Sequence, residues 1–118
     1  MFDPVPQPLL PAVFHIMLAL GDHDLHGYAI KREIEMRTGG AISLGPGALY
    51  GTLQRMLADG LIAECGERAD PERDNVRRRF YRLTAEGRKL AAAEAARLES
   101  LVRLARAKHI LRKPRTAT

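Results

Sequence analysis

The sequence predicts a mainly α-helical domain with one small β-hairpin. Before residue 60, apolar residues recur at spacings of three and four, which is the period of an amphipathic helix. Residues 77–83 instead alternate in character, which is typical of a strand. The chain has 118 residues, 46% of them hydrophobic and 28% charged, so its size and composition predict one folded domain.

Three helices are predicted in the first half of the chain. The first begins in the turn that contains Pro8 and Pro11 and continues to Leu20, because proline fits the first turn of a helix. The second is expected over residues 26–38, after the turn at 21–24 and before Gly39-Gly40. The third opens at Pro46 and ends at Gly60. Its apolar stripe consists of Leu49, Leu53, Met56 and Leu57.

A hairpin and a long helix are predicted in the second half. Residues 61–66 form the expected first strand, 67–76 a polar, charged tip, and 77–83 the return strand. Thr84 is a good N-cap, and after Gly87 nothing breaks a helix as far as Leu111. A helix over 85–111 would be about 40 Å long at about 1.5 Å per residue, longer than so small a domain can cover.

The apolar face of this last helix predicts a second copy as its partner, because uncovered apolar faces tend to associate. The alternative is a solvated surface helix. The candidate dimer contacts are Leu90, Leu98, Leu101, Val102 and Ala105.

This order of elements is that of a winged helix-turn-helix domain followed by a C-terminal dimerisation helix. The second and third helices would form the helix-turn-helix, and the hairpin would be the wing. We expect an N-terminal arm over residues 1–8, the winged domain over 9–84, the long helix over 85–112 and a basic tail over 113–118.

The charge distribution predicts a polyanionic partner. Residues 1–60 hold four Lys/Arg and six Asp/Glu, whereas residues 61–118 hold fifteen and eight. Nucleic acid is the first expectation and an anionic membrane surface the second. No apolar run approaches the ~20 residues of a membrane helix, residues 1–10 lack a basic leader pattern, and Cys65 is the single cysteine. These observations predict a cytoplasmic protein without a membrane segment.

Three motifs in the right order closely resemble the PadR family of bacterial transcriptional regulators. They are His-Gly-Tyr-Ala-Ile at 26–30, Gly-Ala-Leu-Tyr-Gly-Thr-Leu-Gln-Arg-Met-Leu at 47–57 with Gly-Leu-Ile at 60–62, and Arg-Phe-Tyr-Arg-Leu-Thr-Ala-Glu-Gly-Arg at 79–88. The single C-terminal helix is similar to the shorter PadR subfamily. The resemblance implies a homodimer, cytoplasmic residence, usually repression of transcription, and a small-molecule effector of unknown identity. Some short relatives bind flat aromatic compounds between tryptophans, whereas this chain has no Trp.

Candidate DNA contacts on the third helix lie away from its apolar stripe. Tyr50 and Thr52 are candidates for phosphate, Gln54 for bidentate reading of adenine, and Arg55 is the one basic residue of this helix. The alternative is that Tyr50 is packed and Gln54 merely solvated. Ser43, just before the helix, either binds phosphate or holds the turn.

Basic residues of the wing and the second helix are the other candidates. Arg77, Arg78 and Arg79 lie on the return strand, where alternation lets at most two of them point at one duplex. The alternative is a charged strand paired with acidic residues of the tip, which resists aggregation. Lys31 and Arg32 of the second helix are weaker candidates.

Other site chemistries have little support in the sequence. His23, Asp24 and His26 are the one metal-like group, and a helix-entry turn is the favoured interpretation. We expect no metal, no cofactor and no enzymatic activity, since none of the common catalytic motifs is present. The expected function is therefore DNA-binding transcriptional regulation at a pseudo-palindromic operator. The alternative is a winged-helix protein-interaction module that does not read DNA.

Overall fold

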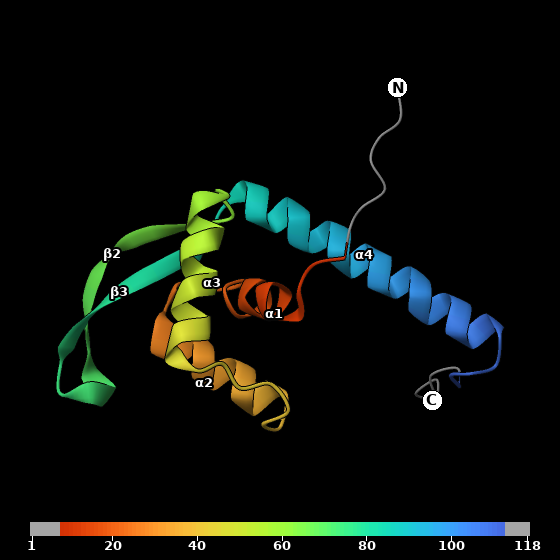
Figure 1. Ribbon diagram of the computed structural model, residues 1–118, viewed down its shortest axis with the longest axis horizontal. Coiled ribbons are helices and arrows are strands. Elements are labelled where there is room, and N and C mark those ends of the chain that lie inside the picture. The colour runs from red at the N-terminus through yellow and green to blue at the C-terminus, as the bar shows by residue number, and fades with distance from the viewer. Residues whose placement is uncertain (1–7, 113–118) are drawn as a thin grey trace, which may run out of the picture.

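The computed structural model describes residues 8–112, and within them four α-helices accompany a three-stranded antiparallel sheet (Figure 1). The elements in chain order are α1 (Pro11–Ala19), β1 (Leu25–His26), α2 (Gly27–Arg37), α3 (Pro46–Ala58), β2 (Ile62–Asp70), η1 (Pro71–Arg73), β3 (Val76–Leu83) and α4 (Ala85–Ala107). The hairpin β2–β3 projects to one side of α1, α2 and α3, and α4 extends to the other (Figure 1). The predicted winged helix-turn-helix fold is confirmed. Most of the predicted arm, residues 1–7, and the basic tail lie outside the described residues.

The core is formed where the first three helices meet the sheet. The most deeply buried large side chains come from α1, α2 and α3; they are Ile16, Met17, Ile30, Ile34, Leu53 and Met56. Ile62 of β2 and Tyr81 of β3 close this core from the sheet side. Because one face of α3 is buried here, its opposite face is left toward solvent.

Three of the helices end with the same pair of backbone hydrogen bonds. After α3, Gly60 adopts a left-handed φ of 73°, its N–H donates to the Leu57 carbonyl, and the Leu61 N–H donates to the Met56 carbonyl. The end of α2 repeats this arrangement at Gly39.

The end of α4 corrects the predicted boundary at Leu111. His109 takes the left-handed position with φ 61°, and the Ile110 N–H donates to the Ala105 carbonyl, so the helix stops at Ala107. The sequence has no glycine here that would predict the end of the helix, and histidine seldom adopts the left-handed conformation.

The wing differs from its prediction, because its first strand continues through the segment predicted as a charged tip. β2 reaches Asp70, and the turn shrinks to η1 and the two residues after it. The register shifts between Glu64 and Glu67, where Gly66 has a φ of 103°. Beyond this bulge, Glu67 lies opposite Arg79 in the register. Its carboxylate pairs diagonally with Arg77, and that of Glu64 pairs with Arg79, so ion pairs join two strands whose pairing hydrophobicity does not indicate.

The two-residue strand β1 was not predicted. Leu25 pairs with Tyr81 and His26 with Phe80, so the turn before α2 becomes an edge of the wing sheet. The wing is thereby joined to the start of the helix-turn-helix.

Candidate nucleic-acid interface

The exposed face of α3 presents three of its four predicted contacts. Tyr50 is 46% exposed, and Gln54 and Arg55 are exposed, while Leu49 and Leu53 on the other side are buried. Thr52 is half-buried, and its hydroxyl donates to the Ala48 carbonyl at 2.7 Å. The face is polar and carries one cation.

A close approach between α2 and α3 holds Tyr50 in place. A side-chain carbon at Gly27 would lie 3.0 Å from the Tyr50 hydroxyl and 3.1 Å from its ring, tighter than most side chains tolerate. The absence of a side chain at Gly27 therefore lets Tyr50 lie over the first turn of α2, half in and half out of solvent.

Two of the weaker candidates, Ser43 and Lys31, contact Glu35 of α2. The Ser43 hydroxyl donates to the Glu35 carboxylate at 2.7 Å, and the Lys31 Nζ lies 3.5 Å from it. The hydrogen bond from Ser43 is the main reason that the pKa of Glu35 is lowered, with Lys31 adding to it. In this structure Ser43 therefore holds the turn before α3.

The three wing arginines point to two different faces of the sheet, as alternation along β3 requires. Arg77 and Arg79 lie on one face and remain exposed, with carboxylates of Glu67 at 3.7 Å and Glu64 at 3.2 Å. Exposed pairs of this kind contribute little to stability, so both guanidiniums could exchange their carboxylate for a phosphate.

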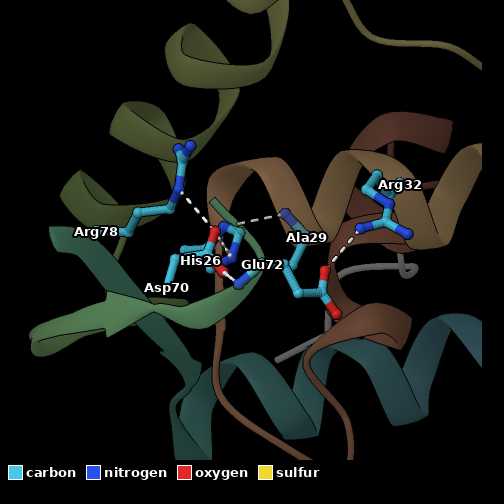
Figure 2. A network of polar contacts seen from close by, with 6 residues as sticks. All are labelled: His26, Ala29, Arg32, Asp70, Glu72 and Arg78. Carbon is cyan, nitrogen blue, oxygen red and sulfur yellow. Dashed lines mark hydrogen bonds and ion pairs between the residues drawn. The ribbon is translucent and has the colours of Figure 1, made fainter. Parts of the chain in front are cut away.

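Arg78 lies on the opposite face in a polar network that reaches α2 (Figure 2). Its Nε donates to the Asp70 carboxylate at 3.0 Å, and its side chain is 21% exposed. His26 contacts the same carboxylate from the start of α2. Burial is the main reason that the pKa of His26 is lowered; Asp70 opposes this effect and Arg78 adds to it.

The candidate dimer residues of α4 fall into two groups. Leu90 is half-buried against the core of its own chain. Leu98, Leu101 and Val102 are 36%, 51% and 37% exposed, and Ala105 is partly exposed. The apolar face therefore becomes uncovered in the distal half of α4.

A buried carboxylate marks the boundary between these halves. Glu94 is 6% exposed, accepts a hydrogen bond from the Leu9 N–H at 3.2 Å, and is bound by both Nε and Nη2 of Arg97 at 2.7 and 2.9 Å. The hydrogen bonds from Arg97 are the main reason that the pKa of Glu94 is lowered. Glu94 thus ties α4 to Leu9, which precedes α1, and beyond Glu94 most of the helix is exposed within residues 8–112.

Residues 16–93 match the family described as "Transcriptional regulator PadR-like family". The chain belongs to this family. The resemblance read from the three sequence motifs is thereby confirmed, and the PadR-like chain falls among regulators of transcription and not among enzymes.

Individual relatives agree with this assignment. The PadR-like chain is 36% identical over 89 residues to the "Transcriptional regulator Rv3488" of Mycobacterium tuberculosis, covering 75% of this chain and 77% of that protein. It is 41% identical over 80 residues to an "Uncharacterized 37.1 kDa protein in transposon TN4556" of Streptomyces fradiae, covering 68% of this chain. The chain matches only 21% of the length of that second relative.

A solved structure has the same fold. The crystal structure of a PadR family transcription regulator from Clostridium difficile superposes with a TM-score of 0.65 at 23% identity, covering 80% of this chain and 93% of the other.

The metal-like group of the sequence is dispersed in the PadR-like fold. His23 lies 3.4 Å from Asp22, whereas Asp24 binds Arg68 and His26 faces Asp70. Among residues 8–112, no three His, Cys, Asp or Glu side chains are grouped so that they could hold a metal ion. Within the same range, no helix is both long and apolar enough to cross a bilayer.

Two buried acidic residues were missed by sequence reasoning. Asp70 lies in a polar, charged stretch that is typical of a solvated segment. Glu94 is a single charged residue in an alanine-rich stretch of helix, four residues from both Leu90 and Leu98, and its charge led us to expect solvent exposure. Each offered one signal in the sequence. Glu94 is in line with Leu90 and Leu98 of the apolar stripe. Asp70 precedes a proline, which is typical of a turn or helix entry, and Asp70 does cap η1 by accepting from the Glu72 N–H.

Proposed function

We propose that this PadR-like chain binds double-stranded DNA as a homodimer, with α3 in the major groove, and represses transcription from a pseudo-palindromic operator in the cytoplasm. The observation that carries the proposal is the solvent-facing side of α3, with Tyr50, Gln54 and Arg55 on it, in a fold whose wing exposes Arg77 and Arg79. A helix in the major groove reads base edges, while basic residues of a wing contact the backbone.

Each exposed residue then has a chemical role. The Gln54 amide matches the donor and acceptor pair of adenine, and Tyr50 and Arg55 offer donors to phosphate or a base edge. Thr52 would donate to phosphate only after its hydroxyl turns from the Ala48 carbonyl. Ser43 and Lys31 would have to leave Glu35 in the same way.

The distal half of α4 supports the homodimer. Leu98, Leu101, Val102 and Leu104 are each more than a third exposed, which leaves a continuous apolar stripe that residues 8–112 do not cover. Two such helices packed about a two-fold axis would bury both stripes and place the α3 helices in successive major grooves about 34 Å apart. A small-molecule effector that alters this separation would weaken binding.

A binding titration tests this function. Duplexes selected by the protein from a randomised pool are compared with a random duplex, each at two salt concentrations. We expect tighter binding of the selected duplex and a fall in affinity with salt, because phosphate contacts release counterions. Absence of salt-dependent binding to any duplex would favour the alternative, a winged-helix protein-interaction module, which the single cation on α3 also permits.

A further inference from the structure

His26 joins the helix-turn-helix to the wing through both nitrogens of its ring (Figure 2). Nδ1 accepts a hydrogen bond from the Ala29 N–H at 3.1 Å and so caps α2. Because Nδ1 is an acceptor, the proton of the neutral ring is on Nε2, which lies 3.4 Å from the Asp70 carboxylate. The two residues are 9% and 5% exposed.

Asp70 connects the far end of the wing to this histidine. It is the last residue of β2. It accepts hydrogen bonds from the Arg78 Nε at 3.0 Å and from the Glu72 N–H at 3.1 Å, and the His26 Nε2 lies 3.4 Å from it. A buried carboxylate is costly unless its oxygens are bound, and here one cation and one backbone N–H bind them, with the His26 ring in contact.

Further contacts between the wing tip and α2 surround this network. Arg32 of α2 donates to the Glu72 carboxylate at 2.9 Å. The Arg73 guanidinium lies 4.6 Å from the centre of the Tyr28 ring, within the range of a cation–π contact. The tip of the wing is therefore docked on α2, and His26 with Asp70 is the buried part of that contact.

We infer that His26 is a positioning residue that fixes the wing against α2. Through Asp70 and Arg78 it holds β3 against α2. The position of Arg77 and Arg79, on the other face of β3, is thereby fixed relative to α3. In this arrangement Arg78 supports the wing and does not bind phosphate. The statement about DNA rests on the proposed function, whereas the docking itself does not.

Two substitutions separate the two contacts of His26. In H26N, the Asn Oδ1 takes the place of Nδ1 and caps α2, since Asn is a preferred N-cap, but the side chain is too short to reach Asp70. In H26Q, the longer amide donates to Asp70 but leaves the Ala29 N–H uncapped. H23N is the control, because His23 lies in the same turn with its side chain 59% exposed.

Hydrogen exchange of the free protein is the first measurement. We expect H26N to exchange the amides of residues 67–79 about twofold to tenfold faster than wild type, the factor that corresponds to one lost polar contact. H26Q and H23N should keep wild-type exchange there, although H26Q lowers the thermal midpoint. If H26N leaves exchange in the wing unchanged, the inference is wrong. If H26N does not fold, D70N tests the same contact from the wing, with the same two outcomes.

The salt dependence of DNA affinity is the second measurement. H26N should reduce the slope of log affinity against log salt by about one to two, because the wing arginines lose their placement. H26Q should keep the wild-type slope. An equal slope in H26N and wild type would contradict the positioning role. If wild type itself binds no DNA, the proposed function fails, and hydrogen exchange still decides whether His26 docks the wing.

Discussion

Gly87 shows how a single residue determines where α4 starts. The Thr84 hydroxyl oxygen accepts a hydrogen bond from the Gly87 N–H and donates to the Gly60 carbonyl, which joins the start of α4 to the end of α3. Gly87 is buried in this joint, and a carbon attached to it would overlap the carbonyl of Leu61. The glycine therefore belongs to this helix in spite of its low helix propensity.

Gly87→Ala should destabilise the fold. The atom that the new carbon would overlap is the backbone carbonyl oxygen of Leu61, which cannot rotate away. We therefore expect the free energy of unfolding, measured with urea, to fall by about 1 to 3 kcal/mol. Gly51→Ala is the control, because Gly51 lies in α3 with open space around it. That substitution should raise stability by about 0.5 to 1 kcal/mol. Equal changes in the free energy of unfolding for Gly87→Ala and Gly51→Ala would refute the close approach between Gly87 and Leu61.

The lowered pKa of His26 predicts a dependence of stability on pH. The unfolded chain binds a proton at this histidine below about pH 6.5, whereas burial and Arg78 hold the folded-state pKa lower in spite of Asp70 and Glu72. Folding therefore excludes a proton, and stability falls as the pH drops below about 6.5 toward the folded-state pKa.

Comparison with H26N isolates this contribution from those of other groups, such as His15, whose pKa is also lowered by burial. The difference in unfolding free energy between wild type and H26N should shrink from about pH 7.5 to about pH 5. A difference that stays constant over this range would show that His26 titrates alike in both states.

Local patterns in the sequence predicted residues whose role is set by their neighbours along the chain. Thr84 and Pro46 were placed correctly at helix starts, and Gly60 at a helix end, because caps act over one turn. Asp70 and Glu94 could not be found in this way. Their burial depends on His26 and on Leu9, which are distant in sequence, and only the folded chain brings these groups together.

At the scale of elements, the wing was predicted as a hairpin but not as a docked one. The alternation on β3 separated the faces of Arg77, Arg78 and Arg79, yet it could not say which face meets α2. The strand β2 was predicted too short, because a bulge and charged cross-strand pairs hide its period. Ion pairs between two charged strands depend on the register between them, so neither strand alone predicts the pairing.

The wing arginines should divide into two classes. Arg77→Ala with Arg79→Ala should lower affinity for all duplexes alike and reduce the salt slope by about one to two, without loss of stability, because both are exposed. Arg78→Ala should instead lower the thermal midpoint, since it leaves the buried Asp70 without its cation. Titrations and melting curves on the same proteins distinguish the classes. Identical behaviour of the two proteins would contradict this division.

Gln54 provides the corresponding prediction for α3. Its side chain is exposed, so Gln54→Ala should leave the free energy of unfolding nearly unchanged. On the selected duplex we expect a loss of about 1 to 3 kcal/mol in binding free energy, and on a random duplex much less, because base contacts discriminate and phosphate contacts do not. Equal losses on both duplexes would mean that Gln54 reads no base.

At the scale of the whole molecule, α4 is divided by Glu94. Its 23 residues span about 35 Å at about 1.5 Å per residue, and among residues 8–112 its buried contacts with other elements lie before and around Glu94. The sequence predicted both the length and the apolar stripe, and the structure adds the point, at Glu94, after which the helix no longer packs on the winged domain. This division allows the free half to be altered while the contacts of Glu94 and Arg97 are kept.

Leu98→Glu with Val102→Glu tests whether the free half joins two subunits. Both side chains are more than a third exposed, so the subunit fold should survive, but two carboxylates in a buried dimer contact should separate the subunits. Ala96→Glu with Ser100→Glu is the matched control, because it adds the same charge at the same spacing on two exposed positions of α4. Sedimentation equilibrium should show dimers for wild type and the control, and monomers for L98E/V102E.

Operator affinity should follow the oligomeric state and not the charge. A monomer loses the effective concentration that couples its second half-site to the first, so L98E/V102E should bind about a hundredfold or more weakly. The control carries the same added negative charge, so any loss that it shares with L98E/V102E is electrostatic. A wild-type monomer at micromolar concentration, or a dimer that persists in L98E/V102E, would refute this interface. In either case the exposed stripe of α4 would need a different cover, and the spacing of the two α3 helices would no longer follow from it.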